Sequence, residues 1–318
     1  MGSAPTGGEH ERAAVTRPHG RHTIMRIFIT GASGYVGAVV AEHLVRAGHE
    51  VVALARSDKA RERVEGLGAK AVPGGLRDLD VLRGAAAAAQ AVVHTAVDYA
   101  DPDMGEIERD TLAALLDGLN EGGRFVYTST GLVYPDRQGA TVDEDHPVAP
   151  ETSPQPYKVL GERQVLAAGH VAGTVIRAAL VYGRGGSGLL QGLIAAGRQG
   201  GTVPYIGDGA NAWSSVHVDD LAALYVAAIE HRDAGTVVNA ASAERTPIRR
   251  IAETVAGLTG AQAVSLTLEQ GIAAMGPLAA TLTRSSPMDA SRARRLFGWA
   301  PERPGLIEEL TTGSYAQS

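Results

Sequence analysis

The sequence predicts an α/β fold, in which a doubly wound parallel sheet is joined to a smaller mixed C-terminal lobe. Three observations support this prediction. Short apolar runs alternate with helix-forming segments between residues 25 and 182, as expected of a parallel sheet covered by helices. A glycine-rich turn over 31–37 joins the first apolar run to the first helix. Beyond Gly183 the regular alternation ends and loop-rich segments follow.

The glycine turn lies within a strand–turn–helix–strand pattern over 25–54. Gly31 allows a tight turn out of the strand, Gly34 lets a pyrophosphate approach the backbone, and Gly37 lets the helix pack closely on the sheet. The N-terminus of the helix presents free N–H groups and a partial positive charge to phosphates. In this setting the glycines predict a Rossmann-type dinucleotide site, and an ordinary glycine-rich turn is the alternative.

The residues after the second strand favour NADP as the cofactor. In a dinucleotide fold this position faces the adenosine ribose, where an acidic residue would favour NAD. Arg56 and Ser57 occupy it here, and a guanidinium forms charge-assisted bonds to a 2′-phosphate. NAD is the less favoured alternative, because Arg56 could also be a solvated loop arginine and Asp58 lies close by.

The remaining elements of the sheet follow from the same alternation. Helix-forming segments lie at 59–67, 78–89, 106–118 and 159–168. Apolar runs predict strands at 69–73, 91–96, 124–130 and 174–181.

The C-terminal third is expected to form a substrate lobe. We expect a helix at 189–198, a strand and turn at 202–209, a strand and helix over 213–230, a strand at 236–239, and mostly helix thereafter. Asp219 or Asp220 could cap the helix within 213–230. The dinucleotide-binding domain is therefore assigned to 25–182, with 214–240 returning to it, and the substrate lobe to 183–213 and 241–318.

The ends and loops of the chain complete this organisation. Residues 1–24 are rich in Gly, Pro, His and Arg and have no apolar signal core, so we expect a disordered extension. The cleft between the two parts is the expected substrate site, with walls at 183–188, 203–213 and 275–282.

Composition narrows the class of protein. The 318 residues carry a net charge of −6, which argues against nucleic acid as a partner. The chain has no cysteine, which excludes disulfides and fits a reducing compartment, so a cytoplasmic location is expected. We expect neither a membrane span nor a metal site, because no apolar run is long enough and no ligand cluster has suitable spacing.

Several motifs carry a family resemblance. They are TGASGYVG (30–37), AVVHTA (91–96), YTSTGLVY (127–134), KVLGE (158–162), VIRAALVYG (175–183), SVHVDDLA (215–222) and RRLFGWAP (294–301). Together they resemble the extended or atypical short-chain dehydrogenase/reductases, often called the NAD-dependent epimerase/dehydratase family. The resemblance covers nearly all of the chain after Met25. It implies that Thr130 is the catalytic Ser/Thr and Lys158 the family lysine. It also implies cofactor contacts at Gly31, Ser33, Gly34, Tyr35, Val36, Gly37, Leu76, Thr95, Ala96 and Lys158.

The chain departs from the family pattern at the catalytic pair, which is normally Tyr-x-x-x-Lys. Pro154 lies four residues before Lys158, and Tyr157 directly precedes it. Three hypotheses follow. Tyr157 and Lys158 still act together from the first helical turn, another group supplies the proton, or the site binds the cofactor without conventional redox chemistry. The candidates for another proton donor are Tyr134, Tyr99 and Asp98. A smaller departure is Gly75, which replaces an Asp and removes one adenine contact.

These expectations define a leading function, an NADP-dependent oxidoreductase of a small carbonyl or alcohol substrate. Thr130 would hold the substrate oxygen, Tyr157 would donate the proton, and Lys158 would orient the ribose and lower the tyrosine pKa. The alternatives are a nucleotide-sugar epimerase or dehydratase with bound NAD, a non-catalytic NADP-sensing regulator, and a redox-neutral enzyme of the same fold. The resemblance also suggests a homodimer through helices 106–119 and 157–168.

Three further side chains are weaker candidates. His94 is expected to be a packed residue, and His217 to anchor loops. Arg184 could bind an anionic group of the substrate, although loop arginines are usually solvated.

Overall fold

The structure is a computed structural model that describes residues 23–231 and 235–316. The expected disordered extension 1–24 therefore lies almost entirely outside the described residues.

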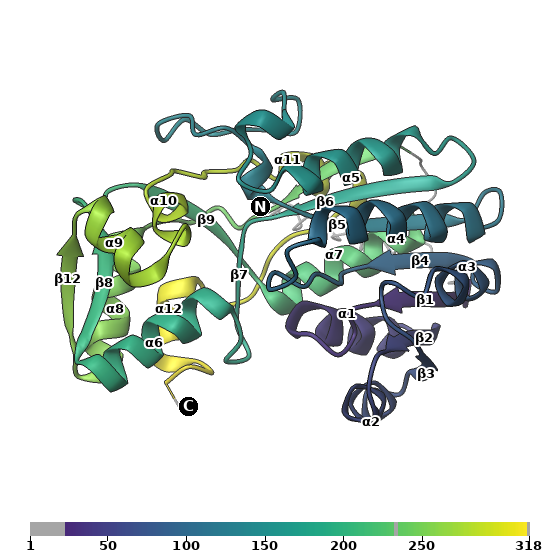
Figure 1. Cartoon of the computed structure of the whole chain (residues 1–318), viewed down its shortest axis with the longest axis horizontal. Helices are drawn as coiled ribbons and strands as arrows, with labels where there is room; N and C mark the ends of the chain where they lie inside the picture. Colours follow the sequence, from purple (N-terminus) through teal and green to yellow (C-terminus); the bar gives the residue numbers. More distant parts are fainter. Residues whose placement is uncertain (1–22, 232–234, 317–318) are drawn as a thin grey trace, which may run out of the picture.

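A seven-stranded parallel sheet forms the larger part of the molecule (Figure 1). Its order is β10-β6-β5-β4-β1-β2-β3, and every neighbouring pair is parallel. The strands are β1 (Arg26–Thr30), β2 (Glu50–Ala55), β3 (Lys70–Pro73), β4 (Ala91–His94), β5 (Arg124–Thr130), β6 (Ala172–Ala178) and β10 (Thr236–Ala240). The order reverses direction between β1 and β4, and in doubly wound sheets ligands bind beyond the carboxyl ends of the strands at such a point. The predicted α/β Rossmann-type sheet is confirmed.

Helices cover both faces of this sheet. One face carries α3 (Leu79–Ala87), α4 (Met104–Gly118) and α5 (Pro156–Ala167), and the other carries α1 (Tyr35–Arg46), α7 (Val218–Glu230) and α11 (Ser291–Phe297). Helix α2 (Asp58–Gly66) packs on β2 and β3. Strand β1 shows why both faces are covered, since its side chains alternate between them. Ile27 and Ile29 join the α1–α7 core, whereas Phe28 joins the α3–α4 core.

A smaller lobe lies beside the sheet (Figure 1). It holds a three-stranded sheet of β7 (Leu180–Tyr182), β9 (Ala212–His217) and β11 (Arg245–Pro247), and a pair of β8 (Thr202–Ile206) and β12 (Gln262–Leu266). Its helices are α6 (Gly188–Gly200), α8 (Ile248–Thr259), α9 (Leu268–Met275), α10 (Leu278–Leu282) and α12 (Leu306–Thr312). A separate apolar core, which includes Leu190, Ile194 and Ile251, holds these elements together.

Two expected elements are wrong in this part of the chain. The single strand expected over 174–181 is divided at Ala179, whose N–H donates to the Ala240 carbonyl. Its first part, β6, stays in the large sheet, and its second part, β7, pairs with β9 of the small lobe. Strands β11 and β12 lie where helix was expected, because their partners β9 and β8 are about 30 and 60 residues away in the sequence and no local pattern reveals the pairing.

Candidate active site

The glycine turn is tight and packs closely against the segment after β4. Gly31 has a φ of +80°, and a Cβ there would lie 2.6 Å from the Ala96 nitrogen. A Cβ on Gly37 would clash with the Gly31 carbonyl oxygen, so this residue allows close packing of α1. Gly34 is exposed, and a Cβ there would meet only the Gly31 oxygen at 3.2 Å. The cradle of Gly31, Gly34 and Gly37 before α1 therefore leaves the backbone at Gly34 accessible, as expected where an anion binds a helix N-terminus.

The other predicted residues of the turn lie around this cradle. Ser33, Tyr35 and Val36 are partly exposed at the start of α1. Thr95 donates from its hydroxyl to the Thr30 carbonyl (2.8 Å), which fixes the segment after β4 beside β1. Ala96 follows directly, so both residues lie just beyond the carboxyl end of β4, where a nicotinamide is expected.

The adenosine end of the predicted site is built from β2 and β3. The Arg56 side chain is 76% exposed, and its Nη1 lies 3.1 Å from Asp98 Oδ2. The Ser57 hydroxyl caps α2 by accepting from the Ala60 N–H (3.2 Å), so its oxygen has a structural partner. Leu76 is partly buried, and its carbonyl accepts from the Thr111 hydroxyl (2.9 Å).

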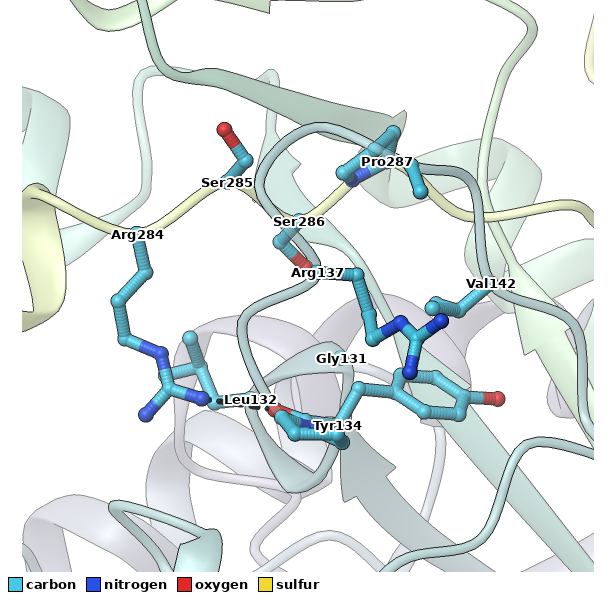
Figure 2. Close-up of a pocket in the computed structure, with 11 residues that line it drawn as sticks. Gly131, Leu132, Tyr134, Arg137, Val142, Arg284, Ser285, Ser286 and Pro287 are labelled. Carbon is cyan, nitrogen blue, oxygen red and sulfur yellow. Dashed lines mark hydrogen bonds between the residues drawn. The ribbon is translucent and has the colours of Figure 1, made fainter.

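Thr130 ends β5 beside a small pocket. Its hydroxyl accepts from the Leu132 N–H (3.2 Å), a local turn bond that leaves the hydroxyl hydrogen available to an acceptor. Figure 2 shows the pocket, in which residues from the segment after β5 face residues of the Arg284–Pro287 segment. Its lining includes Gly131, Leu132, Tyr134, Arg137 and Arg284. The walls expected at 183–188, 203–213 and 275–282 do not line this pocket.

Lys158 is buried and bound to a carboxylate that the sequence analysis missed. Its Nζ donates to Glu108 Oε1 on α4 (2.7 Å), and both side chains are almost fully buried. The Tyr127 hydroxyl also donates to Glu108 Oε1 (2.5 Å), and His94 Nε2 lies 3.2 Å from Oε2. Burial alone would raise the pKa of Glu108, but the ammonium of Lys158 and the hydrogen bonds with His94 and Lys158 lower it well below its usual value.

Tyr157 lies in the first turn of α5 and is half-buried. Its hydroxyl oxygen is buried and has no hydrogen-bond partner within the described residues. Burial, with Tyr99 and Glu108 nearby, raises the pKa of Tyr157 well above its usual value. This direction is opposite to the lowering by Lys158 that we expected. An orphaned buried hydroxyl at the end of the sheet is a group that a ligand can satisfy.

The other suggested proton donors have different surroundings. The buried Tyr134 donates to Asn239 Oδ1 (2.8 Å) and accepts from Arg177 Nη1 (2.9 Å), so it belongs to a structural network. Burial raises the pKa of Tyr134 to about 12. Tyr99 is 71% exposed, and Asp98 pairs with Arg56.

The weaker candidates have structural partners. Arg184 forms ion pairs with Glu42 (2.6 Å) and Asp219, so its guanidinium already has carboxylate partners. The expected Asp caps of α7 are wrong, since the His217 side chain accepts the Asp219 N–H (3.1 Å) instead. Asp220 accepts from the N–H groups of Glu302 and Arg303. His94 is fully buried, as expected.

Glu108 could have been suspected from one signal in the sequence. It falls on the face of α4 that is otherwise apolar, where Leu112 and Leu115 are fully buried. A buried carboxylate requires a cation, but the sequence does not indicate which one. Among the described residues, no group of His, Cys, Asp and Glu could hold a metal ion, and no helix is long and apolar enough to cross a bilayer.

Comparison with known proteins identifies the family. The model of the NAD dependent epimerase/dehydratase family matches residues 27–241. The chain therefore belongs to this family of extended short-chain dehydrogenase/reductases. The predicted class, an NAD(P)-dependent enzyme of that superfamily, is confirmed.

Individual relatives span most of the chain. Uncharacterized protein C2A9.02 of Schizosaccharomyces pombe is 30% identical over 92% of this chain and 100% of its own length. The 2-alkyl-3-oxoalkanoate reductase of Stenotrophomonas maltophilia is 28% identical over 76% of this chain and 77% of its own. DesIV, a dTDP-glucose 4,6-dehydratase of Streptomyces venezuelae solved with NAD bound, superposes with a TM-score of 0.77 at 21% identity, covering 92% and 96% of the chains.

Proposed function

We propose that this protein is an NADP-dependent oxidoreductase that acts on a small carbonyl or alcohol. The observation that carries the cofactor preference is Arg56, which presents an exposed guanidinium just after β2. An acid at this position would favour NAD, whereas a guanidinium favours a 2′-phosphate. The names of related reductases support the reaction type.

The residues around the expected cofactor site fit the individual tasks of this reaction. A bound nicotinamide would supply or accept the hydride. The cradle of Gly31, Gly34 and Gly37 would hold the pyrophosphate, with Ser33, Tyr35 and Val36 around it. Ser57, Leu76, Thr95 and Ala96 would line the rest of the cofactor site. Thr130 would donate to the substrate oxygen, Tyr157 would donate the proton, and Lys158 would lie toward the nicotinamide ribose.

A cofactor titration tests the proposal. The purified protein is titrated with NADPH and with NADH, and the Arg56→Ala variant is titrated in the same way. We expect tighter binding of NADPH, which Arg56→Ala weakens about tenfold or more by removing charge-assisted bonds, with little change for NADH. Arg63→Ala, on the exposed side of α2, is the matched control. A preference for NADH, or unchanged NADPH binding in Arg56→Ala, would contradict the proposal.

A second candidate is a nucleotide-sugar epimerase or dehydratase that keeps NAD bound. Two arginines, Arg137 and Arg284, line the pocket next to Thr130 and would suit an anionic substrate (Figure 2). A UDP-glucose 4-epimerase of Mycolicibacterium smegmatis is 29% identical over 87% of this chain. One assay distinguishes the reductase from the epimerase or dehydratase. The protein is denatured as isolated, and the released nicotinamide cofactor is measured. Stoichiometric NAD supports this candidate, and a protein that arrives empty supports the reductase.

We also propose a homodimer that uses α5. Leu160 and Leu166 are 54% and 37% exposed on this helix, so a second copy that covered Leu160 would remove apolar surface from water. Light scattering on the purified protein should give the mass of a dimer, and Leu160→Glu should shift it toward the monomer. A monomeric mass for the wild-type protein would contradict the proposed dimer.

A further inference from the structure

A buried polar cluster joins five elements beneath the candidate site. Glu108 on α4 is 1% exposed and lies at its centre. Its Oε1 accepts from Lys158 Nζ (2.7 Å) and from the Tyr127 hydroxyl (2.5 Å), and its Oε2 lies 3.2 Å from His94 Nε2. His94 Nδ1 lies 2.7 Å from the Thr30 hydroxyl. The carboxylate therefore has a donor or hydrogen-bonding group on each of its oxygens.

The packing around the cluster fixes the position of Lys158. Its Nζ lies 4.8 Å from the centre of the Tyr127 ring and 5.7 Å from the centre of the Tyr157 ring. The ring of His94 stacks on Tyr127 with an interplanar angle of 5°. A Cβ on Gly161 would clash with the Tyr127 hydroxyl, so only glycine lets this phenol reach Glu108. Lysine side chains that are this enclosed require a partner charge, and Glu108 supplies it.

This arrangement changes what Lys158 can do for Tyr157. A lysine lowers the pKa of a phenol when its positive charge is close and not compensated. Here the residue four positions before Lys158 is Pro154, Tyr157 is its direct neighbour, and the ammonium points to Glu108. We propose that Glu108 is a positioning residue: its ion pair fixes the Lys158 ammonium and compensates the positive charge that would otherwise activate Tyr157. This inference rests on the proposed oxidoreductase function.

The electrostatics of Tyr157 support the same conclusion. The ionisable groups that face it are Tyr99 after β4, Glu108 on α4, Tyr127 on β5 and Lys158 beside it. Burial is the largest cause that raises the Tyr157 pKa, followed by Tyr99 and Glu108. A phenol of this kind holds its proton at neutral pH, so it meets a carbonyl substrate as a neutral hydrogen-bond donor, and it is a weaker acid than a tyrosine activated by lysine would be.

The corresponding reduction balances in atoms and charge. The carbonyl carbon gains a hydride, with NADPH as the reductant, and the π electrons of the C=O bond move to the oxygen. That oxygen takes the proton of Tyr157, which gives the alcohol and leaves a phenolate. A proton from the solvent then restores the phenol, so one proton is consumed for each carbonyl reduced. The carbonyl is reduced and NADPH is oxidised to NADP⁺.

Tyrosine NMR tests the inference without a substrate. The protein is labelled with ¹³C at the tyrosine ζ carbon, and the Tyr157 signal is assigned by its loss in Tyr157→Phe. In the wild type we expect this signal to stay unshifted up to about pH 10, the ordinary pKa of tyrosine. A Tyr157 signal that titrates below pH 9 in the wild type would overturn the inference. This titration needs no variant beyond the one used for assignment.

The Glu108→Gln variant tests the role of the carboxylate directly. Removing its charge should lower the pKa of Tyr157 by at least one, both because Glu108 no longer repels the phenolate and because Lys158 is no longer neutralised. Glu162→Gln is the matched control. Glu162 lies on the same helix as Tyr157, and its substitution breaks a buried ion pair with Arg177 while leaving Glu108 intact. An equal shift in both variants, or none in Glu108→Gln, would contradict the proposal. The cofactor titration decides the proposed function separately.

Discussion

The catalytic role of Tyr157 can be tested at the level of a single oxygen atom. Tyr157→Phe removes the proton donor and leaves the ring, so NADPH oxidation with an accepted aldehyde or ketone should fall about a hundredfold or more. NADPH binding should be unchanged, because no cofactor contact is assigned to this hydroxyl. The rate is followed by the loss of NADPH absorbance.

The matched control for this substitution is Tyr225→Phe. Tyr225 is fully buried on α7, and its hydroxyl lies 2.5 Å from the Thr128 hydroxyl. This variant should keep its turnover. Full activity in Tyr157→Phe would instead assign the proton to another group.

Site residues that belong to a local turn can be predicted from the sequence, whereas partners joined by tertiary packing cannot. Gly31 and Gly37 can be predicted, because the turn that needs them is local and its spacing is fixed. The partner of Lys158 cannot, because Glu108 lies 50 residues away on another helix and is brought close only by tertiary packing. For the same reason the sequence suggested a lowered pKa for Tyr157, whereas burial and Glu108 raise it.

Helix interiors offer a direct comparison of two glycines. Gly161 in α5 faces the Tyr127 hydroxyl, whereas a Cβ on Gly84 in α3 would meet nothing within 4 Å. Gly84→Ala should stabilise the protein by about 0.5–1 kcal/mol, since alanine loses less backbone entropy in a helix. Gly161→Ala should destabilise it by about 1–3 kcal/mol through overpacking. Urea unfolding of both variants checks this, and equal effects would contradict the packing argument.

The loop between β7 and α6 links the cofactor turn to the C-terminal segment. Tyr35, in the glycine turn, donates to the Gly183 carbonyl (2.8 Å), and its ring covers Gly186 so closely that a Cβ there would clash. Tyr315 donates to the Gly186 carbonyl (2.8 Å) and accepts from the Gly183 N–H (2.9 Å). Arg184 in this loop has a φ of +52°, a strained conformation that these contacts hold in place.

Tyr315→Phe should therefore weaken NADPH binding, although Tyr315 is far in sequence from the turn. The lost hydroxyl leaves the Gly183 N–H without its partner, which loosens Tyr35, and we expect affinity to fall about three- to tenfold. Fluorescence titration with NADPH measures it. Tyr182→Phe is the control, because its hydroxyl donates to Pro304 in the same lobe (2.8 Å). Unchanged affinity in Tyr315→Phe would show that the loop does not support the turn.

Most elements of the larger sheet could be predicted, and those that failed share one cause. Strands β1, β4 and β5 are short apolar runs bounded by turns, so their local pattern suffices. The division at Ala179 depends on where the chain leaves one sheet for another, which is decided by pairing with β10 and β9. The cap of α7 failed similarly, because Asp219 has stronger partners in Arg184 and His43.

Acid should lower the free energy of unfolding of the protein, because Asp219 becomes protonated. This carboxylate, at the start of α7, accepts from Arg184 in the β7–α6 loop and from His43 on α1 (2.9 Å). Burial raises the pKa of Asp219, but the hydrogen bonds from Arg184 and His43 have the larger combined effect and lower the pKa to about 2. Its folded pKa lies below its unfolded value of about 3.9, so its stabilisation is complete above that value and is lost as pH falls toward 2.

The stability of Asp219→Asn should therefore depend less on pH. Between pH 6 and pH 2, the wild type should lose about 1–2 kcal/mol more than this variant in urea unfolding. Asp117→Asn, an exposed position on α4, is the control and should follow the wild type. Parallel losses in all three proteins would assign the acid sensitivity to other carboxylates.

The place of β10 has a consequence for synthesis on the ribosome. Strand β6 becomes an interior strand only when β10 pairs with it, and β10 follows about 60 residues later in the chain. At about 5–20 residues per second, the nascent protein keeps that edge unpaired for about 3–12 s. An open apolar edge is a template for aggregation, so this interval is when a chaperone matters most. Messages truncated before Thr236 would leave the edge open permanently, and their products should be insoluble.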